Sequence, residues 1–339
     1  MLSGTVRNRG KEMSNLHDNS IIIDGLIISN WSRSVFEAMR DGGLTAVNCT
    51  CCVWDDFRGV MNNIAQWKRW FSEHDDLLLP VFTTDDIRRA KAEGKVGIIL
   101  GWQNTSGIED QIGFLKVFKD LGVGVMQLTY NTQNLSGSGC WETHDGGLSD
   151  FGREVIDEMN RVGILLDLSH VGPKTSEDAI RYSRKPVAFT HCVPNGLKDF
   201  PRNKSDELLR LIVDKGGFAG FATYPPFLPT GADTTVEDCV DAVDYMVNLL
   251  GEDNVGIGTD FTQDQDDAFF EYLRHDKGYA RRLVPKGISD IPTTAEGLKK
   301  ISDFPNLTAA MERRGWPEGR IVKIMGENWM RVLKEAWGA

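Results

Sequence analysis

Gly163-Ile-Leu-Leu-Asp-Leu-Ser-His170 decides the fold, together with Lys185-Pro-Val-Ala-Phe-Thr-His191, which follows about twenty residues later. Both are apolar runs of the length of a buried parallel strand, and both end in a histidine where polar sequence with Gly or Pro begins. The residues between them, 175–183, are enough for a crossover helix. Two consecutive β-α units therefore predict two imidazoles side by side at the carboxyl edge of one sheet, where α/β folds bind ligands and metals.

The same alternation of apolar runs and helical segments covers most of the chain. Roughly eight strands without an interrupting linker predict one (β/α)8 TIM barrel over residues 20–339, with C-terminal helices near 307–314 and 317–337. An open doubly wound sheet is the weaker alternative, because no G-x-G-x-x-G follows an early strand and no P-loop is present. The predicted strands are 21–28, 44–53, 96–100, 123–130, the run ending at 170, 185–191, 217–223 and 254–260, with a short apolar run at 77–82.

Composition excludes several classes of partner. The chain has 339 residues, 41% hydrophobic and 26% charged, with 38 Lys and Arg against 49 Asp and Glu for a net charge of −11. Because there is no basic cluster, neither nucleic acid nor an anionic membrane surface is expected as a partner. No apolar run approaches the ~20 residues of a transmembrane helix.

The N-terminus and the cysteines suggest a cytoplasmic setting. Residues 1–19 are polar, carry no signal-peptide core and are predicted to be a flexible leader. Three of the six cysteines crowd into Cys49-Thr-Cys51-Cys52, which does not resemble a secreted disulfide framework. We expect buried, inert thiols.

Three strand ends carry residues suited to catalysis. In a barrel these ends converge on one mouth, and His170, His191 and Asp260 there suit a divalent metal with a general acid or base. Asp260 ends an apolar strand, so its carboxyl group is expected to have a raised pKa and to transfer protons. The alternative readings are hydrogen-bonded core histidines and a helix-capping aspartate.

Other polar residues at the predicted mouth are candidates for binding substrate. Arg202, in the loop after the second histidine, can bind a substrate carboxylate with two hydrogen bonds, although a plain surface arginine fits the sequence equally well. Gln103, Asn104 and Tyr224 are predicted to orient substrate, and Tyr130 to take part in catalysis. The alternative is that such residues only satisfy buried backbone at the barrel rim.

In combination, several stretches resemble the membrane (renal-type) dipeptidase family of metallopeptidases. They are 147–152, 160–170, 186–191, 202–203, 216–217 and 256–261. The resemblance implies an amidohydrolase-like (β/α)8 barrel, usually dimeric, that uses two zinc ions to hydrolyse dipeptides and related amides. It also implies that His170 and His191 hold a metal, that Arg202 binds substrate and that Asp260 transfers the proton.

The first half of the chain departs from that family pattern. Leu26 and Ile28 occupy the positions of a metal-binding His and Asp, Gln103 that of a bridging glutamate, and Tyr130 that of a histidine. Two zinc ions close together repel strongly, and without the acidic ligands nothing offsets that repulsion. The sequence therefore predicts one zinc ion at most, weakly bound or absent, at the histidine pair.

The leading hypothesis is a metal-dependent hydrolase with this reduced metal site. It would cleave an amide or other C–N bond in a small substrate that bears a carboxylate, such as a dipeptide, as a homodimer or higher homo-oligomer. Two alternatives remain. The same barrel could run non-hydrolytic chemistry, as a decarboxylase, lyase or isomerase, or the chain could be a metal-free pseudoenzyme.

Overall fold

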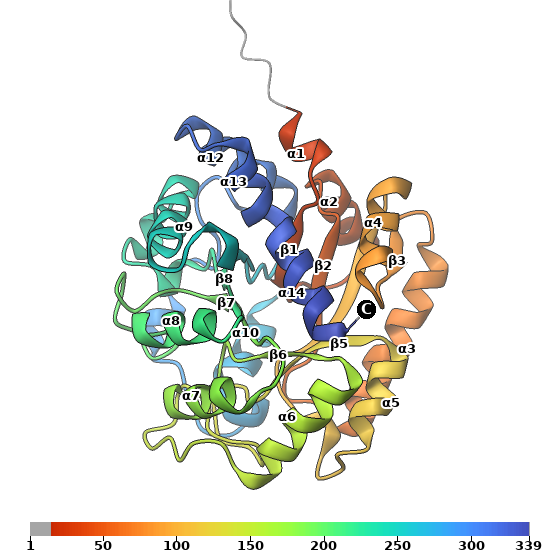
Figure 1. Ribbon diagram of the computed structural model, residues 1–339, viewed down its shortest axis with the longest axis vertical. Coiled ribbons are helices and arrows are strands. Elements are labelled where there is room, and N and C mark those ends of the chain that lie inside the picture. Colours follow the sequence, from red (N-terminus) through yellow and green to blue (C-terminus); the bar gives the residue numbers. More distant parts are fainter. Residues whose placement is uncertain (1–14, 339) are drawn as a thin grey trace, which may run out of the picture.

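The apolar runs of the chain are the strands of one parallel sheet that closes on itself (Figure 1). In this computed structural model, which describes residues 15–338, the strands pair in the order β1-β2-β4-β5-β6-β7-β8-β9. A parallel bridge between Ile27 and Phe261 joins the two ends of that order. The predicted (β/α)8 barrel is thus confirmed and the open sheet is excluded. The run at 77–82 contributes only the short β3, which pairs with β4 beside the barrel.

The bounds of the elements follow the chain order. The strands are β1 (Ile23–Ile27), β2 (Ala46–Cys52), β3 (Leu78–Pro80), β4 (Val96–Trp102), β5 (Val123–Gln127), β6 (Leu165–Asp167), β7 (Ala188–Cys192), β8 (Phe218–Phe221) and β9 (Val255–Ile257). The α-helices are α1 (Leu16–Asn19), α2 (Arg33–Asp41), α3 (Phe57–Glu73), α4 (Thr84–Glu93), α5 (Phe114–Leu121), α6 (Asp150–Val162), α7 (Pro173–Tyr182), α8 (Asp206–Asp214), α9 (Val236–Leu250), α10 (Asp267–Arg274), α11 (Lys286–Ser289), α12 (Pro305–Arg313), α13 (Glu318–Val322) and α14 (Asn328–Trp337). The shorter helical turns are η1 (Ser106–Ile108), η2 (Pro225–Phe227), η3 (Gly231–Asp233), η4 (Glu252–Asn254), η5 (Asp276–Gly278), η6 (Ile301–Asp303) and η7 (Lys323–Glu327).

Local signals in the sequence delimit the helix that leads into the first histidine strand. Ser149 accepts a hydrogen bond from the backbone N–H of Gly152 at 2.9 Å and so caps the start of α6. Gly163 ends the helix at φ +79°, a left-handed conformation that glycine adopts without steric cost. The chain then turns directly into β6, which places His170 just beyond the carboxyl end of that strand.

The start of the folded domain differs from its predicted boundary. Residues 1–14 of the predicted leader lie outside the described residues, but Leu16–Asn19 form α1. His17 is buried there, and its ring nitrogens contact the hydroxyl of Thr308 at 2.7 Å and the carbonyl of Gly42 at 3.0 Å. The last part of the predicted leader is therefore packed on the barrel, because one imidazole joins two distant segments.

The amino end of the barrel is closed by the C-terminal residues, which form three elements where the sequence predicts one helix. A π-helical turn, η7, separates α13 from α14. At Gly326 a Cβ atom would lie 2.0 Å from the carbonyl oxygen of Ile21, so only glycine fits this close approach. Trp329 then donates its indole N–H to the carbonyl of Ile257 at 2.9 Å. Figure 1 shows α14 crossing the near end of the barrel, with α10 behind it at the far end.

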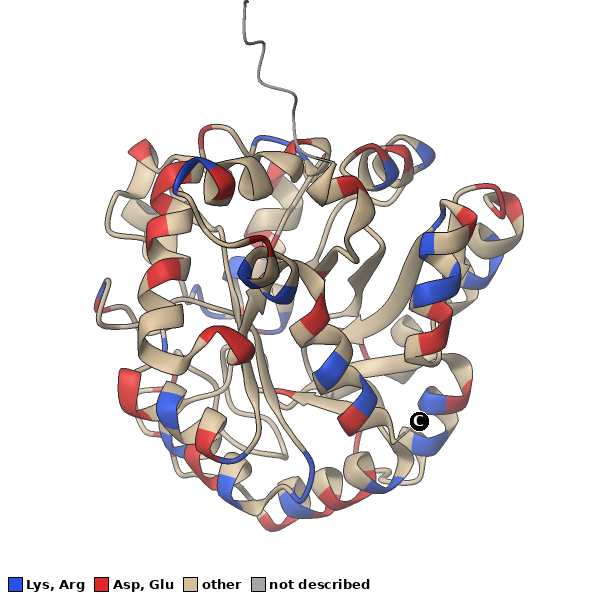
Figure 2. Ribbon diagram, turned by 45° about the horizontal axis from the view of Figure 1, so that its top comes forward, with Lys and Arg blue, Asp and Glu red and all other residues tan. Residues whose placement is uncertain are grey.

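The carboxyl end is covered by residues 267–289, the roof segment, which comprises α10, η5 and α11. This segment was not predicted from the sequence. The roof segment packs on an apolar cluster of Ile28, Val53 and Tyr130 from strand ends, with Trp54, Phe269, Tyr272 and Leu273 against them. Most Lys, Arg, Asp and Glu residues lie on the outer helices and few lie on the strands (Figure 2). The barrel mouth is therefore a sheltered, mainly apolar space.

All six cysteines are buried with free thiols, as expected. Among the described residues, no helix is both long and apolar enough to cross a membrane.

Candidate functional site

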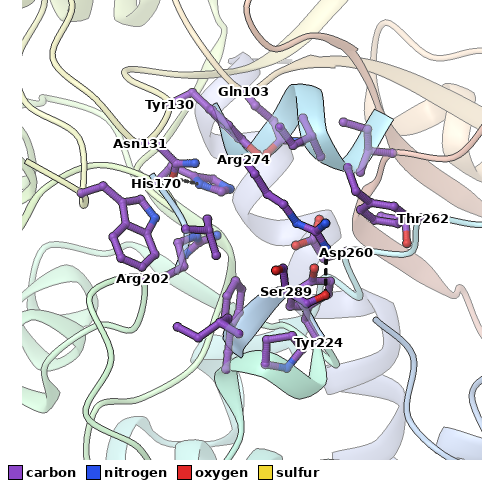
Figure 3. A pocket seen from close by; sticks show the side chains of 18 of the residues that line it. Gln103, Tyr130, Asn131, His170, Arg202, Tyr224, Asp260, Thr262, Arg274 and Ser289 are labelled. Carbon is purple, nitrogen blue, oxygen red and sulfur yellow. Dashed lines mark hydrogen bonds between the residues drawn. The ribbon is translucent and has the colours of Figure 1, made fainter. Parts of the chain in front are cut away.

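A cavity lies at the barrel mouth between the strand ends and the roof segment (Figure 3), with about 730 Å³ of empty space when the solvent at its opening is counted. It contains most of the residues that the sequence singled out, and aromatic side chains form much of its wall. The lining residues are Ile28, Gln103, Tyr130, Asn131, Trp141, His170, Phe200, Arg202, Tyr224, Pro226, Phe227, Asp260, Thr262, Phe270, Leu273, Arg274, Val284, Ile288 and Ser289.

The two histidines meet as the strand register predicts. Nε2 of His170 lies 3.1 Å from Nε2 of His191. Nδ1 of His191 contacts the hydroxyl of Thr190 at 2.8 Å, and that hydroxyl donates to the carboxyl group of Asp167 at 2.8 Å. Because the hydroxyl proton is already used, Nδ1 of His191 must donate, which leaves its Nε2 with a lone pair.

His170 has the same tautomer as His191. Nδ1 of His170 lies 2.8 Å from Oδ1 of Asn131, an acceptor, so this Nδ1 also carries the hydrogen. Burial, with the nearby Arg202 guanidinium, holds the pKa of both imidazoles well below the usual range, so both are neutral. Two neutral Nε2 lone pairs therefore face each other, an arrangement that a shared cation relieves.

Few metal-binding side chains gather at this edge of the barrel. Among the residues that the structure describes, no group of three or more His, Cys, Asp or Glu side chains is placed to hold a metal. Leu26 and Ile28 are buried where the resemblance implies acidic and imidazole ligands. Gln103 donates through Nε2 to the hydroxyl of Thr50 at 3.0 Å, and its amide oxygen, which carries no net charge, is a weaker metal ligand than a carboxylate. His170 and His191 are the residues that would hold a single ion.

Asp260 reaches the cavity from the loop after β9. Its backbone adopts φ +64°, an uncommon conformation for a residue other than glycine, and its N–H donates to the carbonyl of Leu26 at 3.0 Å. Burial raises the pKa of Asp260 to about 6, although the Arg202 guanidinium opposes the shift. A carboxyl group with that pKa can both accept and return a proton near neutral pH.

Arg202 is almost fully enclosed, with 1% of its surface exposed. Its Nη2 donates to the carbonyl of His191 at 2.8 Å, and its guanidinium lies over the ring of Phe227 at 5.4 Å. Nε and Nη1 have no hydrogen-bond partner among the described residues. Burying guanidinium donors without hydrogen-bond partners costs free energy, so these two donors favour the binding of an anion beside them.

Tyr130 covers the first histidine. Its ring lies 4.2 Å from the ring of His170, centroid to centroid, at an interplanar angle of 31°. It also packs with Ile28 and Val53 beneath α10. The wall where the family resemblance implies a first metal is thus filled by hydrocarbon and an aromatic ring.

The structure does not bring every predicted residue into the cavity. Asn104 faces a separate surface depression and accepts a hydrogen bond from Nδ2 of Asn134 at 2.9 Å, so the structure does not bring it to this cavity. It follows Gln103 directly, and adjacent residues of an extended chain face opposite sides. His191 does not itself line the cavity and touches it only through His170.

Many of the lining residues were not predicted from the sequence, among them Asn131, Trp141 and Arg274. Asn131 adjoins Tyr130, and that position could have identified it. Trp141 lies in the long Gly- and Ser-rich loop before α6, and Arg274 in the roof segment. No periodicity or spacing connects either of them with the strand ends.

The sequence of this chain is similar to those of dipeptidases. Residues 30–285 and 287–338 match the family described as membrane dipeptidase (peptidase family M19). The dipeptidase tcpJ of Claviceps purpurea is 30% identical over 284 residues, which are 82% of this chain and 60% of that protein. This chain spans about three fifths of the length of the curated relatives it matches.

Solved structures show the same fold. An amidohydrolase from Pseudomonas aeruginosa is 54% identical, with a TM-score of 0.94 over 96% of this chain and 99% of that one. The probable dipeptidase PvdM from Pseudomonas aeruginosa has a TM-score of 0.81 at 19% identity, over 96% of this chain and 97% of that chain, and supports the fold alone.

Proposed function

Because this chain belongs to the membrane dipeptidase family, we propose that it hydrolyses the amide bond of a small carboxylate-bearing substrate such as a dipeptide. The names of its relatives support hydrolysis: one at 30% identity is a dipeptidase and one at 54% an amidohydrolase. The observation that carries the proposal is that His170, Asp260 and Arg202 with its unpaired donors line one cavity, and that His191 contacts His170.

In this proposal each residue of the site has its own role in the reaction. Nε and Nη1 of Arg202 bind the substrate carboxylate, which supplies the missing partners and places the scissile bond near His170. Asp260 accepts a proton from the attacking water and returns it to the leaving amine. Tyr130 and Tyr224 hold the substrate against this wall and exclude bulk water.

We propose that His170 and His191 hold at most one zinc ion. When bound there, zinc polarises a carbonyl and lowers the pKa of a water molecule. Asn131 on the first imidazole, and Thr190 with Asp167 on the second, fix the ring orientation that such binding needs.

Purified protein, assayed with a panel of dipeptides and measured for metal per chain, tests the proposal. We expect turnover with no more than one zinc per chain, and loss of turnover in an Asp260→Asn variant. Absence of turnover with every dipeptide, amide and lactam at full zinc occupancy would refute it. Size-exclusion chromatography with light scattering tests the accompanying proposal of a homodimer, and cell fractionation that of a cytoplasmic location.

One observation favours a second candidate, non-hydrolytic chemistry such as decarboxylation. The family resemblance implies a first metal at the wall that carries the buried cluster of Ile28, Val53 and Tyr130. This wall is apolar, which suits a reaction that needs no metal there. Turnover that survives chelation would favour this candidate. A metal-free pseudoenzyme would instead show no turnover, and the His170→Ala substitution would leave its ligand binding unchanged.

A further inference from the structure

Positive charge exceeds negative charge around the cavity. The charged lining residues are Arg202, Arg274 and Asp260, and the lining histidine is neutral. Lys204 lies behind this wall with 2% of its surface exposed, and its Nζ donates to the carbonyl of Val171 at 2.7 Å. Neither Arg202 nor Lys204 forms an ion pair with any residue in the part of the chain that the structure describes. Buried charges without partners are costly, which favours an anionic ligand.

Arg274 adds a cation on the opposite side, at the end of α10. Its Nη1 donates to Oε1 of Glu271 at 3.1 Å and its Nη2 to the carbonyl of Ser289 at 3.2 Å. The same Glu271 also binds Nη1 of Arg282 through its second oxygen at 2.7 Å. One carboxylate thus serves two guanidinium groups, so the roof segment keeps an excess positive charge beside the cavity.

The two arginines enter the cavity from different elements. Arg202 comes from the loop after β7, and Arg274 descends from the roof segment toward Asp260 and Ser289 (Figure 3). A single carboxylate bound at Arg202 leaves Arg274 with only the carboxylate of Glu271, which it shares with Arg282. A ligand with two carboxylates, one at each end, satisfies both.

We propose that the substrate of this site carries two carboxylates, the second of which is bound by Arg274, for example a dipeptide with an acidic residue. This inference rests on the proposed function for its reaction, but its charge argument does not depend on hydrolysis. In this proposal the roof segment selects substrates by their charge.

The first test compares kcat/KM for Ala-Glu with kcat/KM for Ala-Ala. The wild type should prefer the acidic dipeptide by roughly 10- to 100-fold, as one added charge-assisted hydrogen bond implies. In Arg274→Met this ratio should fall to within about twofold of unity, and Arg274→Lys should keep part of it. The matched control is Arg281→Met, which removes a cation from the same segment that is more than half exposed and does not line the cavity. That control should keep the full preference.

A charge reversal guards against a general loss of function. Arg274→Glu should reverse the preference and favour Ala-Lys over Ala-Glu, a gain that mere unfolding cannot produce. If Arg274→Met keeps the wild-type ratio, or if the wild type shows no acidic preference while it hydrolyses Ala-Ala, the inference is overturned.

Direct binding separates this inference from the proposed function. Calorimetry should show glutarate, a dicarboxylate, binding at least 10-fold more tightly than butyrate, with the difference lost in Arg274→Met. If no dipeptide is hydrolysed but this difference is present, the hydrolase proposal falls and the dicarboxylate site stands. If hydrolysis occurs and the two acids bind equally, the dicarboxylate site falls alone.

Discussion

Replacing Arg202 by methionine should make the ligand-free protein more stable while it weakens ligand binding. Two unpaired buried donors cost about 1–3 kcal/mol each, and the substitution removes both. It also leaves the carbonyl of His191 unpaired, at about 1–3 kcal/mol, and removes the contact with the Phe227 ring, about 0.5–2 kcal/mol. Taking the middle of each range, we expect a net gain of about 1 kcal/mol in the free energy of unfolding.

Urea unfolding monitored by fluorescence, with and without glutarate, measures both effects. The wild type should gain about 2.7 kcal/mol from glutarate at 100 times its dissociation constant, and Arg202→Met should gain little. Phe227→Leu is the matched control, since it disturbs the same contact but keeps the guanidinium, and it should retain the ligand effect. If Arg202→Met loses several kcal/mol in the free energy of unfolding without ligand and keeps the full stabilisation by glutarate, Arg202 is not an anion-binding residue.

Three further predictions concern titration and metal binding. If Asp260 accepts a proton in the reaction, kcat/KM should fall as pH drops through about 6, and an acidic limb that persists in Asp260→Asn would contradict this. Zinc per chain, measured by atomic absorption, should be lost in His170→Ala and kept in the exposed control His144→Ala; equal zinc in both would remove the histidine pair as the metal site. Burial raises the pKa of Asp24 from 3.8 to about 7, so the folded state takes up a proton over that interval and this group's contribution to stability should decline as pH rises from about 4 to 7. Urea unfolding across that range checks the decline, which Asp24→Asn should reduce.

The sequence predicted the parts of the site that depend on strand register. Apolar runs that end in His170 and His191 belong to adjacent parallel strands, so their side chains had to meet at one edge. Asp260 followed from the same reasoning, because the barrel closes β9 against β1. Such predictions succeed because parallel strands bring the residues at and just after their carboxyl ends to one edge of the sheet.

The roof segment could not be predicted, for a different physical reason. Arg274 reaches the cavity only through the fold of residues 267–289, which are held by isolated contacts such as the hydrogen bond from Thr132 to Asp276 at 2.9 Å. Contacts of that kind leave no periodic pattern in the sequence. The misplacement of Asn104 shows the complementary limit, since a shift of one residue turns a side chain to the other face.

The apolar cluster under α10 also constrains how this protein can evolve. Ile28 occupies a position where a metal ligand would stand and supports the helix that covers the mouth. A carboxylate introduced there alone would be buried without a partner and would loosen the contact with Phe269 and Tyr272 before any ion could compensate. A second metal site here therefore needs more than a single substitution: Ile28 and the helix that packs on it would have to change together.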